Sequence, residues 1–428
     1  MKLLKNYVTI IWKKINKMEI NYGHYLSFSF GWRGITFHSI RIFLKKIMTS
    51  HLVMKFDSIV IGAGVIGLAI ARKLSLEGRS TLLIEKNESF GSGNSSRNSE
   101  VIHSGIYYPK GTLKSKLCLS GYDLLTQYCE SRSIAFDICG KLIIANNESE
   151  ILKINRIFEN GIQVGCKGLE MISEDEIKEL EPNIKAKKAI HVKKTGVIDS
   201  HDLMANLEID ILNSGGIIAY KTFPQNVTFK MNRICLLLTD PENTYEIFTP
   251  HVINCAGLNS LEISSKFKGM FSKDINYEMR LSKGEYFSTN KDLEIQKLIY
   301  PVPDSQSLGI HLTRDLNNRY KFGPSHSWIN EENYQVNNQS RENFLSSIKS
   351  FIKNNDDLEI FPDYAGIRPK IFKDHKQLTD FEITHQKLEK GCSLLNLHGI
   401  ESPGLTSCLS IADYVNNLIY NCSNKIEL

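Results

Sequence analysis

The spacing of apolar residues predicts a strand, a helix and a second strand near residue 60. Residues 58–61 and 81–84 are short, mainly apolar runs with β-branched side chains, typical of strands buried on both faces of a parallel sheet. Between them, apolar residues recur at helical spacing from Ile66 to Leu74, and Gly78 follows as a helix-ending residue. This order predicts a βαβ unit.

Helical and strand patterns continue along the chain. Leucines at helical spacing predict an amphipathic helix over residues 112–131. A capping box at residues 173–176 opens a short helix, and we interpret Asp199 and Ser200 as caps of a helix over residues 201–213. We therefore assign these polar residues to helix termini rather than to chemistry.

The pattern changes after residue 260. Residues 261–363 are more aromatic and more polar, with alternating segments such as 286–288 and 309–313. Such alternation favours a mainly antiparallel sheet in a second domain. Near the C-terminus, a strand at 394–398 leads to a helix that we expect Ser402 to cap, with Pro403 in the first helical position.

Composition places the body of the chain among ordinary globular proteins. The 428 residues suggest two or three domains, and 42% hydrophobic and 23% charged residues are unremarkable values. Residues 1–55 hold ten lysines and arginines against Glu19 alone, a net charge of +9 within an overall +5, so the remainder carries −4. This mildly acidic body argues against a nucleic-acid partner.

The cysteines and histidines give no sign of a disulfide framework or a metal site. Nine cysteines are scattered without any C-x-x-C pair, which argues against zinc and predicts reduced thiols in a reducing compartment. No two histidines fall at ligand spacing on one predicted helix or strand. We expect no metal.

The basic N-terminal extension, residues 1–54, leaves three interpretations open. Arg33 and Arg41 interrupt the apolar stretch 25–44, which argues against a transmembrane helix. The segment is compatible with a mitochondrial presequence, a membrane-surface anchor, or translated sequence upstream of a start at Met54. We favour the last, which predicts a cytoplasmic protein, with a peripheral position at the inner membrane or a mitochondrial location as the alternatives.

The chemistry of the chain begins at a glycine-rich turn between the first predicted strand and helix. Gly62, Gly64 and Gly67 form a complete G-x-G-x-x-G, and Glu85 ends the second strand. Glycines let the backbone turn tightly and approach a pyrophosphate at the helix N-terminus, while the carboxylate suits the ribose hydroxyls of an adenosine. The full context of strand, glycines, helix, strand and acid predicts a dinucleotide-binding unit.

Two further segments suit the same ligand. Residues 91–109 are small and polar, with backbone donors, hydroxyls and Arg97 available around a bound phosphate and ring system. A solvated loop is the alternative. Residues 252–257 form a strand that runs into the small-residue turn Ala256–Gly257, where the backbone can pass close to a dinucleotide.

These motifs resemble FAD-dependent oxidoreductases of the D-amino-acid-oxidase and glycerol-3-phosphate-dehydrogenase superfamily, and most of all L-2-hydroxyglutarate dehydrogenases. The matching segments are N-S-E-V-I-H-S-G-I-Y-Y at 98–108, K-S-K-L-C at 114–118, C-G-K-L at 139–142, T-G-V-I-D at 195–199, A-G-I-R-P at 365–369 and G-I-E-S-P-G-L-T at 399–406. The resemblance covers about residues 56–415. It implies FAD held by Gly62, Gly64, Gly67, Glu85, Ser95, Arg97, Asn98, Ser99, Ala256, Gly257, Gly399, Glu401, Pro403, Gly404, Leu405 and Thr406.

The implied fold is α/β. It combines a Rossmann-like FAD-binding domain of the glutathione-reductase type with an α+β substrate domain on a mainly antiparallel sheet. After the extension at 1–54, we assign 55–134, 196–260 and 364–428 to the FAD-binding domain, and 135–195 and 261–363 to the substrate domain.

One residue departs from the resemblance. Glu100 stands where many 2-hydroxyglutarate dehydrogenases have glycine. A carboxylate near the flavin could repel a dicarboxylate substrate or attract an ammonium group, so it bears on the substrate but not on the flavin chemistry.

Oxidation of a 2-hydroxy acid by flavin needs a base for the hydroxyl proton. His311 is the first candidate, on a predicted strand where it faces Gly309 and Thr313; a hydrogen-bonded structural histidine is the alternative. His103, in the loop expected to meet the flavin, could contact the ring or link to it covalently, and we expect noncovalent binding.

The same reaction needs a cation for the substrate carboxylate. Arg368 is the leading candidate, with Tyr364 and Tyr286 as hydroxyl donors. A salt bridge at the rim of the site is the alternative, and Lys283 and Arg280 are lower-ranked choices. The predicted helix after Ser402 could direct its positive end at the flavin.

Three functions stay open. The leading hypothesis is a dehydrogenase of small 2-hydroxy acids that passes electrons to a membrane quinone or another carrier. An amino-acid oxidase or dehydrogenase of the same fold is the second, and Glu100 is the feature in its favour. A flavin-binding or nucleotide-binding protein without turnover is the third.

Overall fold

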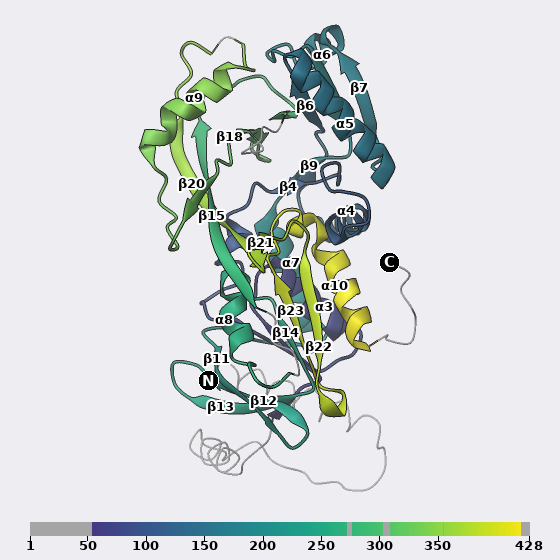
Figure 1. Ribbon diagram of the computed structural model, residues 1–428, viewed down its shortest axis with the longest axis vertical. Coiled ribbons are helices and arrows are strands. Elements are labelled where there is room, and N and C mark those ends of the chain that lie inside the picture. Colours follow the sequence, from purple (N-terminus) through teal and green to yellow (C-terminus); the bar gives the residue numbers. More distant parts are fainter. Residues whose placement is uncertain (1–53, 272–275, 303–308, 354, 421–428) are drawn as a thin grey trace, which may run out of the picture.

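The computed structural model describes residues 54–271, 276–302, 309–353 and 355–420. The predictions made for the N-terminal extension, residues 1–54, therefore concern residues that lie outside this range except for Met54. The described chain is elongated, with two lobes joined by the long strands β15 and β20 (Figure 1).

The lower lobe in Figure 1 is built on a six-stranded sheet of order β10-β3-β2-β14-β23-β22. The first five strands are parallel and β22 is antiparallel. The predicted strand–helix–strand unit is confirmed. The bounds are Ile217–Ala219 (β10), Thr81–Ile84 (β3), Ser58–Ile61 (β2), His251–Asn254 (β14), Ser393–His398 (β23) and Glu382–Lys387 (β22), with α3 at Val65–Leu76 between β2 and β3.

Alternation along these strands gives each face of the sheet its own core. Val60 and Leu83 point to one face, where they pack with α3, α7 and α10, while Ile59 and Leu82 point to the other. The second face is covered by the four-stranded sheet β1-β13-β12-β11 and by α8. The bounds are Ser200–Asn213 (α7), Gly404–Tyr420 (α10), Ser260–Ser265 (α8), Met54–Lys55 (β1), Thr244–Thr249 (β13), Arg233–Thr239 (β12) and Phe223–Lys230 (β11).

The upper lobe is built on a ten-stranded sheet of order β21-β20-β15-β18-β17-β16-β6-β8-β7, with β19 paired to β15. Its pairs are antiparallel except for β16 with β6, so the predicted mainly antiparallel sheet is confirmed. The bounds are Lys376–Gln377 (β21), Phe361–Lys373 (β20), Tyr277–Thr289 (β15), Tyr320–Phe322 (β18), Leu312–Arg314 (β17), Leu298–Pro301 (β16), Lys141–Ala145 (β6), Lys188–Val192 (β8), Leu169–Ser173 (β7) and Ser327–Ile329 (β19).

Helices cover this second sheet, and a small sheet lies between the lobes. Helices α5 (Glu148–Val164), α6 (Glu174–Leu180) and α9 (Arg341–Lys349) pack on the ten-stranded sheet. The small sheet has the order β4-β9-β5, with bounds Val101–Ile102, Gly196–Ile198 and Phe136–Asp137, and α4 spans Leu113–Arg132 beside it.

Three of the predicted domain boundaries fall inside elements. The boundary at 54/55 lies within β1, the one at 260/261 lies within α8 and the one at 363/364 lies within β20. Strands β15 and β20 stay paired from one lobe to the other, so the division of the chain into domains stays a prediction.

Most of the predicted helix ends are confirmed. Thr112 caps α4 through a hydrogen bond from the Ser115 N–H, and the capping box at Ser173 is formed. Asp199 caps α7, whereas Ser200 is the first helical residue, so its prediction as a cap is wrong.

The cap predicted at Ser402 is also wrong. The carbonyl of Pro403 accepts the hydrogen bond from the Ser407 N–H, and α10 begins only at Gly404. The Ser402 hydroxyl instead lies 3.1 Å from His103 Nε2 and 3.2 Å from the Tyr108 hydroxyl, so it serves the loop after β4. Among the described helices, none is long and apolar enough to cross a membrane.

Candidate active site

The glycine-rich turn between β2 and α3 has no room for side chains. Gly62 has a φ of +103°, and a Cβ there would lie 2.5 Å from the Cys255 carbonyl oxygen. A Cβ on Gly67 would overlap the carbonyl oxygen of Gly62, and one on Gly64 would lie 2.9 Å from Ser95 Oγ. The three glycines thus hold the N-terminus of α3 directly over the turn, which leaves its positive end available to an anion.

Glu85 closes this turn from the end of β3. One of its carboxylate oxygens accepts a hydrogen bond of 2.8 Å from the Ala63 N–H, and the other accepts bonds from the backbone and side chain of Asn87. The carboxylate is therefore fixed beside the glycine turn at the position where a dinucleotide places its ribose. Ala256 and Gly257 follow β14 on the other side, and Ala256 Cα would lie 3.2 Å from a Cβ on Gly62.

The segment 95–99 runs from this turn toward the second lobe. Ser95 Oγ accepts a 3.0 Å hydrogen bond from the Val65 N–H at the start of α3, and the Asn98 side chain donates to the Ser95 carbonyl. Ser99 Oγ lies 2.6 Å from the Tyr286 hydroxyl on β15. The Arg97 guanidinium lies 4.2 Å from the centre of the Tyr334 ring, and its role at a phosphate stays a prediction.

The C-terminal turn meets the same place from the opposite direction. A Cβ on Gly404 would lie 3.8 Å from Ile66 Cδ1, so the N-termini of α10 and α3 are adjacent. Thr406 Oγ1 accepts a 3.0 Å hydrogen bond from the His103 N–H. Gly399 has a φ of +64° and lies against Ile371 of β20. Pro403, Gly404 and Leu405 thus open α10 against the glycine turn.

Glu401 is the charged residue of this turn, and it is buried against two lysines. Its Oε1 lies 2.7 Å from Lys370 Nζ on β20 and 3.3 Å from Lys114 Nζ on α4. Burial opposes ionisation, but the two ammonium groups outweigh it and hold the pKa of Glu401 below its ordinary value. The carboxylate therefore connects the turn to α4 and to β20, and its contact with FAD stays a prediction.

One face of the paired strands β15 and β20 carries the predicted carboxylate clamp. Arg368 Nη2 reaches across Gly284 to donate a 2.9 Å hydrogen bond to the Ser325 carbonyl, and a Cβ on Gly284 would lie only 3.3 Å from that nitrogen. Arg368 Nε is buried without a hydrogen-bond partner, and so is Ser282 Oγ on the residue paired with it. Buried donors of this kind can be completed by a polar ligand or by a bound water.

The two predicted tyrosines lie on the same strands. Tyr286 and Tyr364 stack with ring centres 4.4 Å apart. The Tyr364 hydroxyl donates a 2.7 Å hydrogen bond to the Asn98 carbonyl, and Tyr286 meets Ser99. The two tyrosines therefore connect the strands that carry Arg368 to the segment 95–99.

The two predicted histidines lie close enough to each other to interact electrostatically. The His311 ring stacks on the Tyr300 ring at 3.6 Å, and His311 lies one residue before β17 rather than inside a strand. The His103 ring interacts electrostatically with His311 and with Lys141, and with desolvation as the largest cause its pKa falls to about 3. The histidine is thus a neutral imidazole near physiological pH.

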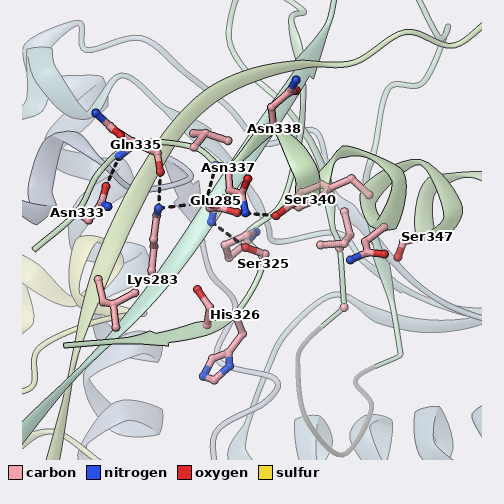
Figure 2. Close-up of a pocket in the computed structure, with 18 residues that line it drawn as sticks. Lys283, Glu285, Ser325, His326, Asn333, Gln335, Asn337, Asn338, Ser340 and Ser347 are labelled. Carbon is pink, nitrogen blue, oxygen red and sulfur yellow. Dashed lines mark hydrogen bonds and ion pairs between the residues drawn. The ribbon is translucent and has the colours of Figure 1, made fainter. Parts of the chain in front are cut away.

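The lower-ranked cations lie elsewhere. Lys283 forms a 3.1 Å ion pair with Glu285 and donates to the Gln335 carbonyl, as Figure 2 shows. This pair lines a pocket of about 890 Å³ on the opposite face of β15 from Arg368. Arg280 pairs with Glu278 on the surface. Neither side chain is free for a substrate carboxylate.

Glu100 has a partner for each of its carboxylate oxygens. Its Oε1 accepts a 2.9 Å hydrogen bond from Ser200 Oγ at the start of α7, and its Oε2 lies 3.7 Å from Lys321 Nζ. A helix N-terminus and an ammonium group both offset its charge. Both contacts weaken the electrostatic effect expected of Glu100 on a substrate.

Sequence reasoning gave no role to four residues of this site. Gly284 and Tyr300 look like ordinary strand residues in the sequence. Gly366 and Lys141 stand within the segments A-G-I-R-P and C-G-K-L, but only the structure shows what they contact. A Cβ on Gly366 would overlap the Arg97 carbonyl oxygen, and Lys141 Nζ lies 4.5 Å from the centre of the Tyr300 ring.

The site fits a flavin dinucleotide. A cradle that Cβ atoms would fill, a fixed carboxylate beside it and a second helix N-terminus at its far end match the two phosphates, the ribose and the ring of FAD. In the described part of the chain, no group of three His, Cys, Asp or Glu residues could hold a metal ion.

Comparisons with known proteins agree with this geometry. A family model described as FAD dependent oxidoreductase matches residues 57–418. The mitochondrial L-2-hydroxyglutarate dehydrogenase of Arabidopsis thaliana is 35% identical over 402 residues, which cover 85% of this chain and 83% of that protein.

Solved structures show the same architecture. L-α-glycerophosphate oxidase from Mycoplasma pneumoniae, with FAD bound, has a TM-score of 0.76 at 21% identity, covering 86% of this chain and 95% of its own. Glycine oxidase from Geobacillus kaustophilus has a TM-score of 0.72 at 18% identity with the same coverage of both chains. At these identities the two structures show a common fold alone.

Proposed function

Because this chain belongs to the family of FAD-dependent oxidoreductases, we propose that it oxidises L-2-hydroxyglutarate, or a closely similar 2-hydroxy acid, to the 2-oxo acid. The single observation that carries the substrate class is the buried, unpartnered Arg368 Nε beside the unpartnered Ser282 Oγ. An arginine and a hydroxyl with free donors match a carboxylate.

The residues that would hold FAD follow from the geometry above. We assign the pyrophosphate to the turn of Gly62, Gly64 and Gly67, the ribose to Glu85, and the ring to the segment 95–99 and the start of α10. Bound FAD supplies the acceptor for the hydride that leaves C2 of the substrate.

The second lobe would bind and orient the substrate. Arg368 holds the carboxylate of the substrate through Nε. Because Gly284 has no side chain, the Arg368 guanidinium can lie across it. The stacked rings of Tyr286 and Tyr364 exclude water from one side. The charged contact with Arg368 and the stacked tyrosine rings then orient the substrate.

We assign the proton acceptor to His103 in preference to His311. The backbone N–H of His103 donates a hydrogen bond to Thr406 Oγ1 in the first turn of α10, where the ring of the cofactor is expected. The Nε2 atom of its imidazole faces the Ser402 hydroxyl. His311 has one face covered by Tyr300. The sequence ranked these histidines in the opposite order.

Turnover with a panel of substrates tests the proposal. The FAD-loaded protein is assayed with an artificial electron acceptor on L-2-hydroxyglutarate, its D-enantiomer, glycerol 3-phosphate and a set of amino acids. We expect L-2-hydroxyglutarate to give the highest kcat/KM and 2-oxoglutarate as product. Preference for an amino acid, with ammonia released, would support the amino-acid oxidase instead.

The electron acceptor and the location are separate proposals. We propose a membrane quinone or another carrier as the electron acceptor. The name of the Arabidopsis relative, a dehydrogenase, fits an acceptor other than oxygen and identifies no particular carrier. The same relative is named as mitochondrial, which supports a presequence in residues 1–54 over an upstream translated segment. Faster reoxidation of the flavin by oxygen than by a quinone analogue would contradict the proposed acceptor. Failure of residues 1–54 to direct a fused fluorescent protein to mitochondria would contradict the proposed presequence.

A further inference from the structure

Lys141 is a buried cation that the proposed reaction does not yet use. It is the first residue of β6, and only 1% of its surface is exposed. Its Nζ lies 4.5 Å from the centre of the Tyr300 ring and 5.1 Å from that of Tyr107. Within the described part of the chain, no hydrogen bond or ion pair reaches this ammonium group.

An ammonium group in such a place is costly without an anion. It loses its hydration, and two aromatic faces offset only part of the loss. Burial lowers the pKa of Lys141 to about 8, so the side chain is mainly protonated at neutral pH. The thiols of Cys118 and Cys166 are neutral at that pH, because burial raises the pKa of each. The charge of Lys141 is therefore available to an anion that enters the site.

The strand register places Lys141 on the face of the ten-stranded sheet that carries the proposed substrate contacts. Five apolar residues form one row across neighbouring strands and pack in one core: Leu142 (β6), Ile299 (β16), Leu312 (β17), Phe322 (β18) and Phe287 (β15). Successive side chains of a strand point to opposite faces, so the residues beside this row lie on the other face. These residues are Lys141, Tyr300, His311 and Tyr286.

Contacts lead along this face from Lys141 toward β15. The Tyr300 ring beside Lys141 is stacked at 3.6 Å on the His311 ring. The His311 carbonyl accepts a 2.9 Å hydrogen bond from the Gly323 N–H. A Cβ on Gly323 would lie 2.8 Å from Tyr286 Cδ1, so the Tyr286 ring leans over this glycine. Lys141 is thus connected to the tyrosines by one continuous row of contacts.

The Arg368 guanidinium lies at the other end of this row. Its Nη2 donates to the carbonyl of Ser325, which follows β18, and a Cβ on Gly284 would lie 2.7 Å from Pro324 Cβ in the same segment. Two strand intervals separate β18 from β16, against which the Lys141 ammonium group lies. Since neighbouring strands are about 4.8 Å apart, we infer a separation of roughly 10–15 Å between the two cations.

A five-carbon dicarboxylate matches this separation. Four C–C bonds of about 1.5 Å hold its carboxyl carbons about 5 Å apart, and a charge-assisted hydrogen bond adds about 3–4 Å at each end. A 2-hydroxy acid with a single carboxylate would reach only one of the two cations.

We propose that Lys141 binds the second carboxylate of the substrate, and that the enzyme thereby selects 2-hydroxy dicarboxylates over 2-hydroxy monocarboxylates. The inference rests on the proposed function. Arg368 holds the carboxylate next to C2, Lys141 holds the one at the far end, and C2 lies between them. A monocarboxylate is disfavoured because it leaves a buried ammonium group without an anion.

Kinetics on a matched pair of substrates tests this selectivity. L-2-hydroxyglutarate and L-2-hydroxypentanoate differ only in the far carboxylate, which is a methyl group in the second. In the Lys141→Met holoenzyme we expect kcat/KM for L-2-hydroxyglutarate to fall by about 10–100-fold, as loss of one charge-assisted hydrogen bond predicts. The value for L-2-hydroxypentanoate should fall by less than about threefold.

Matched variants separate binding of the carboxylate from support of the fold. Lys141→Gln is a second neutral variant should methionine prevent folding. Lys321→Met removes another lysine of the same sheet, whose Nζ already lies 3.7 Å from Glu100 and from Asp315, and should keep the wild-type ratio between the two substrates. FAD content is measured in every variant. Equal losses with both substrates in the two neutral variants would overturn the proposal.

A binding measurement without turnover keeps the two proposals apart. Glutarate has both carboxylates but no hydroxyl group to oxidise, and pentanoate lacks the far carboxylate. Calorimetric titration of the oxidised holoenzyme should show that Lys141→Met weakens glutarate about 10–100-fold and leaves pentanoate within about threefold. Equal glutarate affinity in wild type and variant, or no glutarate binding, would overturn the inference. The expected loss of affinity without flavin reduction by any 2-hydroxy acid would support the carboxylate site and reject the proposed function.

Discussion

The site contains buried polar and charged side chains without a hydrogen-bond or ion-pair partner. Arg368 Nε and Ser282 Oγ are buried donors without acceptors, and Lys141 is a buried cation without a carboxylate. All three residues belong to strands of the ten-stranded sheet. Glu100, in contrast, has partners on both oxygens, although the sequence singled it out.

Replacing Arg368 by lysine should weaken substrate use without loss of FAD. Lysine keeps the charge but cannot span Gly284 with a planar fork. Loss of a charged hydrogen bond of about 1.5–3 kcal/mol predicts that kcat/KM for L-2-hydroxyglutarate falls by about 10–100-fold. Steady-state kinetics measures this effect, with flavin content as the control. An unchanged kcat/KM would remove Arg368 from the carboxylate site.

Replacing Glu100 by glycine should leave the substrate preference as it is. The backbone there has a φ of +58°, which glycine adopts without strain, and the lost carboxylate faces Ser200 and Lys321 rather than a substrate. We expect the ratio of kcat/KM for L-2-hydroxyglutarate to that for glutamate to change by less than about threefold, well under 1 kcal/mol. Glu100→Gln is the matched control. A large gain with amino acids would show that Glu100 selects the substrate.

The sequence identified which residues belong to the site better than it predicted what their side chains contact. Gly62, Gly67 and Glu85 could be found because a βαβ turn restricts which residue types fit it. Gly284 and Tyr300 could not, because their roles arise from strands that pair over long sequence separations. Ser402 was misassigned because its hydroxyl bonds to His103 across the fold rather than to the helix that follows.

At the scale of elements, the N-termini of α3 and α10 meet, and Glu401 fastens the second of them. The carboxylate connects the turn before α10 to α4 and to β20. The periodicity of the chain predicted α3, α4 and α7 well, whereas the contact between α3 and α10 joins segments about 340 residues apart and has no local signal.

Glu401→Gln should destabilise the protein in a pH-dependent way. Two buried lysines would lose their counter-ion, at a cost of about 3 kcal/mol in the free energy of unfolding. The folded-state pKa of Glu401 is depressed below its ordinary 4.5, so its contribution is present above that pH and is lost as the pH falls through the folded-state value. Urea unfolding at several pH values should show the difference from wild type shrinking in acid. A difference that is constant with pH would contradict this account.

Gly67→Ala should weaken FAD binding. The new Cβ would overlap the Gly62 carbonyl oxygen, so the turn must open, at a cost of about 1–3 kcal/mol. We expect FAD affinity to fall by about tenfold or more, measured by titration of the apoprotein. Leu76→Ala in the same helix is the control, because Leu76 is 53% exposed. Equal affinity in the two variants would mean that the cofactor does not lie on this turn.

At the scale of the whole molecule, two lobes share one site. The lobe of the six-stranded sheet supplies the glycine turn and α10 (Figure 1). The ten-stranded sheet supplies Arg368 and the two tyrosines, Tyr286 and Tyr364. The long strands β15 and β20 belong to the second sheet but reach the first lobe, and the boundary placed at 363/364 falls inside β20. Local motifs are enough to predict the fold class and the cofactor, whereas the position of the substrate depends on residues from both lobes.

The most direct test of the central claim is an anaerobic titration of the FAD-loaded protein with L-2-hydroxyglutarate. The account predicts that the visible flavin absorbance bleaches with one equivalent of substrate per flavin and that 2-oxoglutarate forms in the same amount. A flavin that stays oxidised with this substrate but bleaches with an amino acid, or a protein that takes up no FAD, would contradict it.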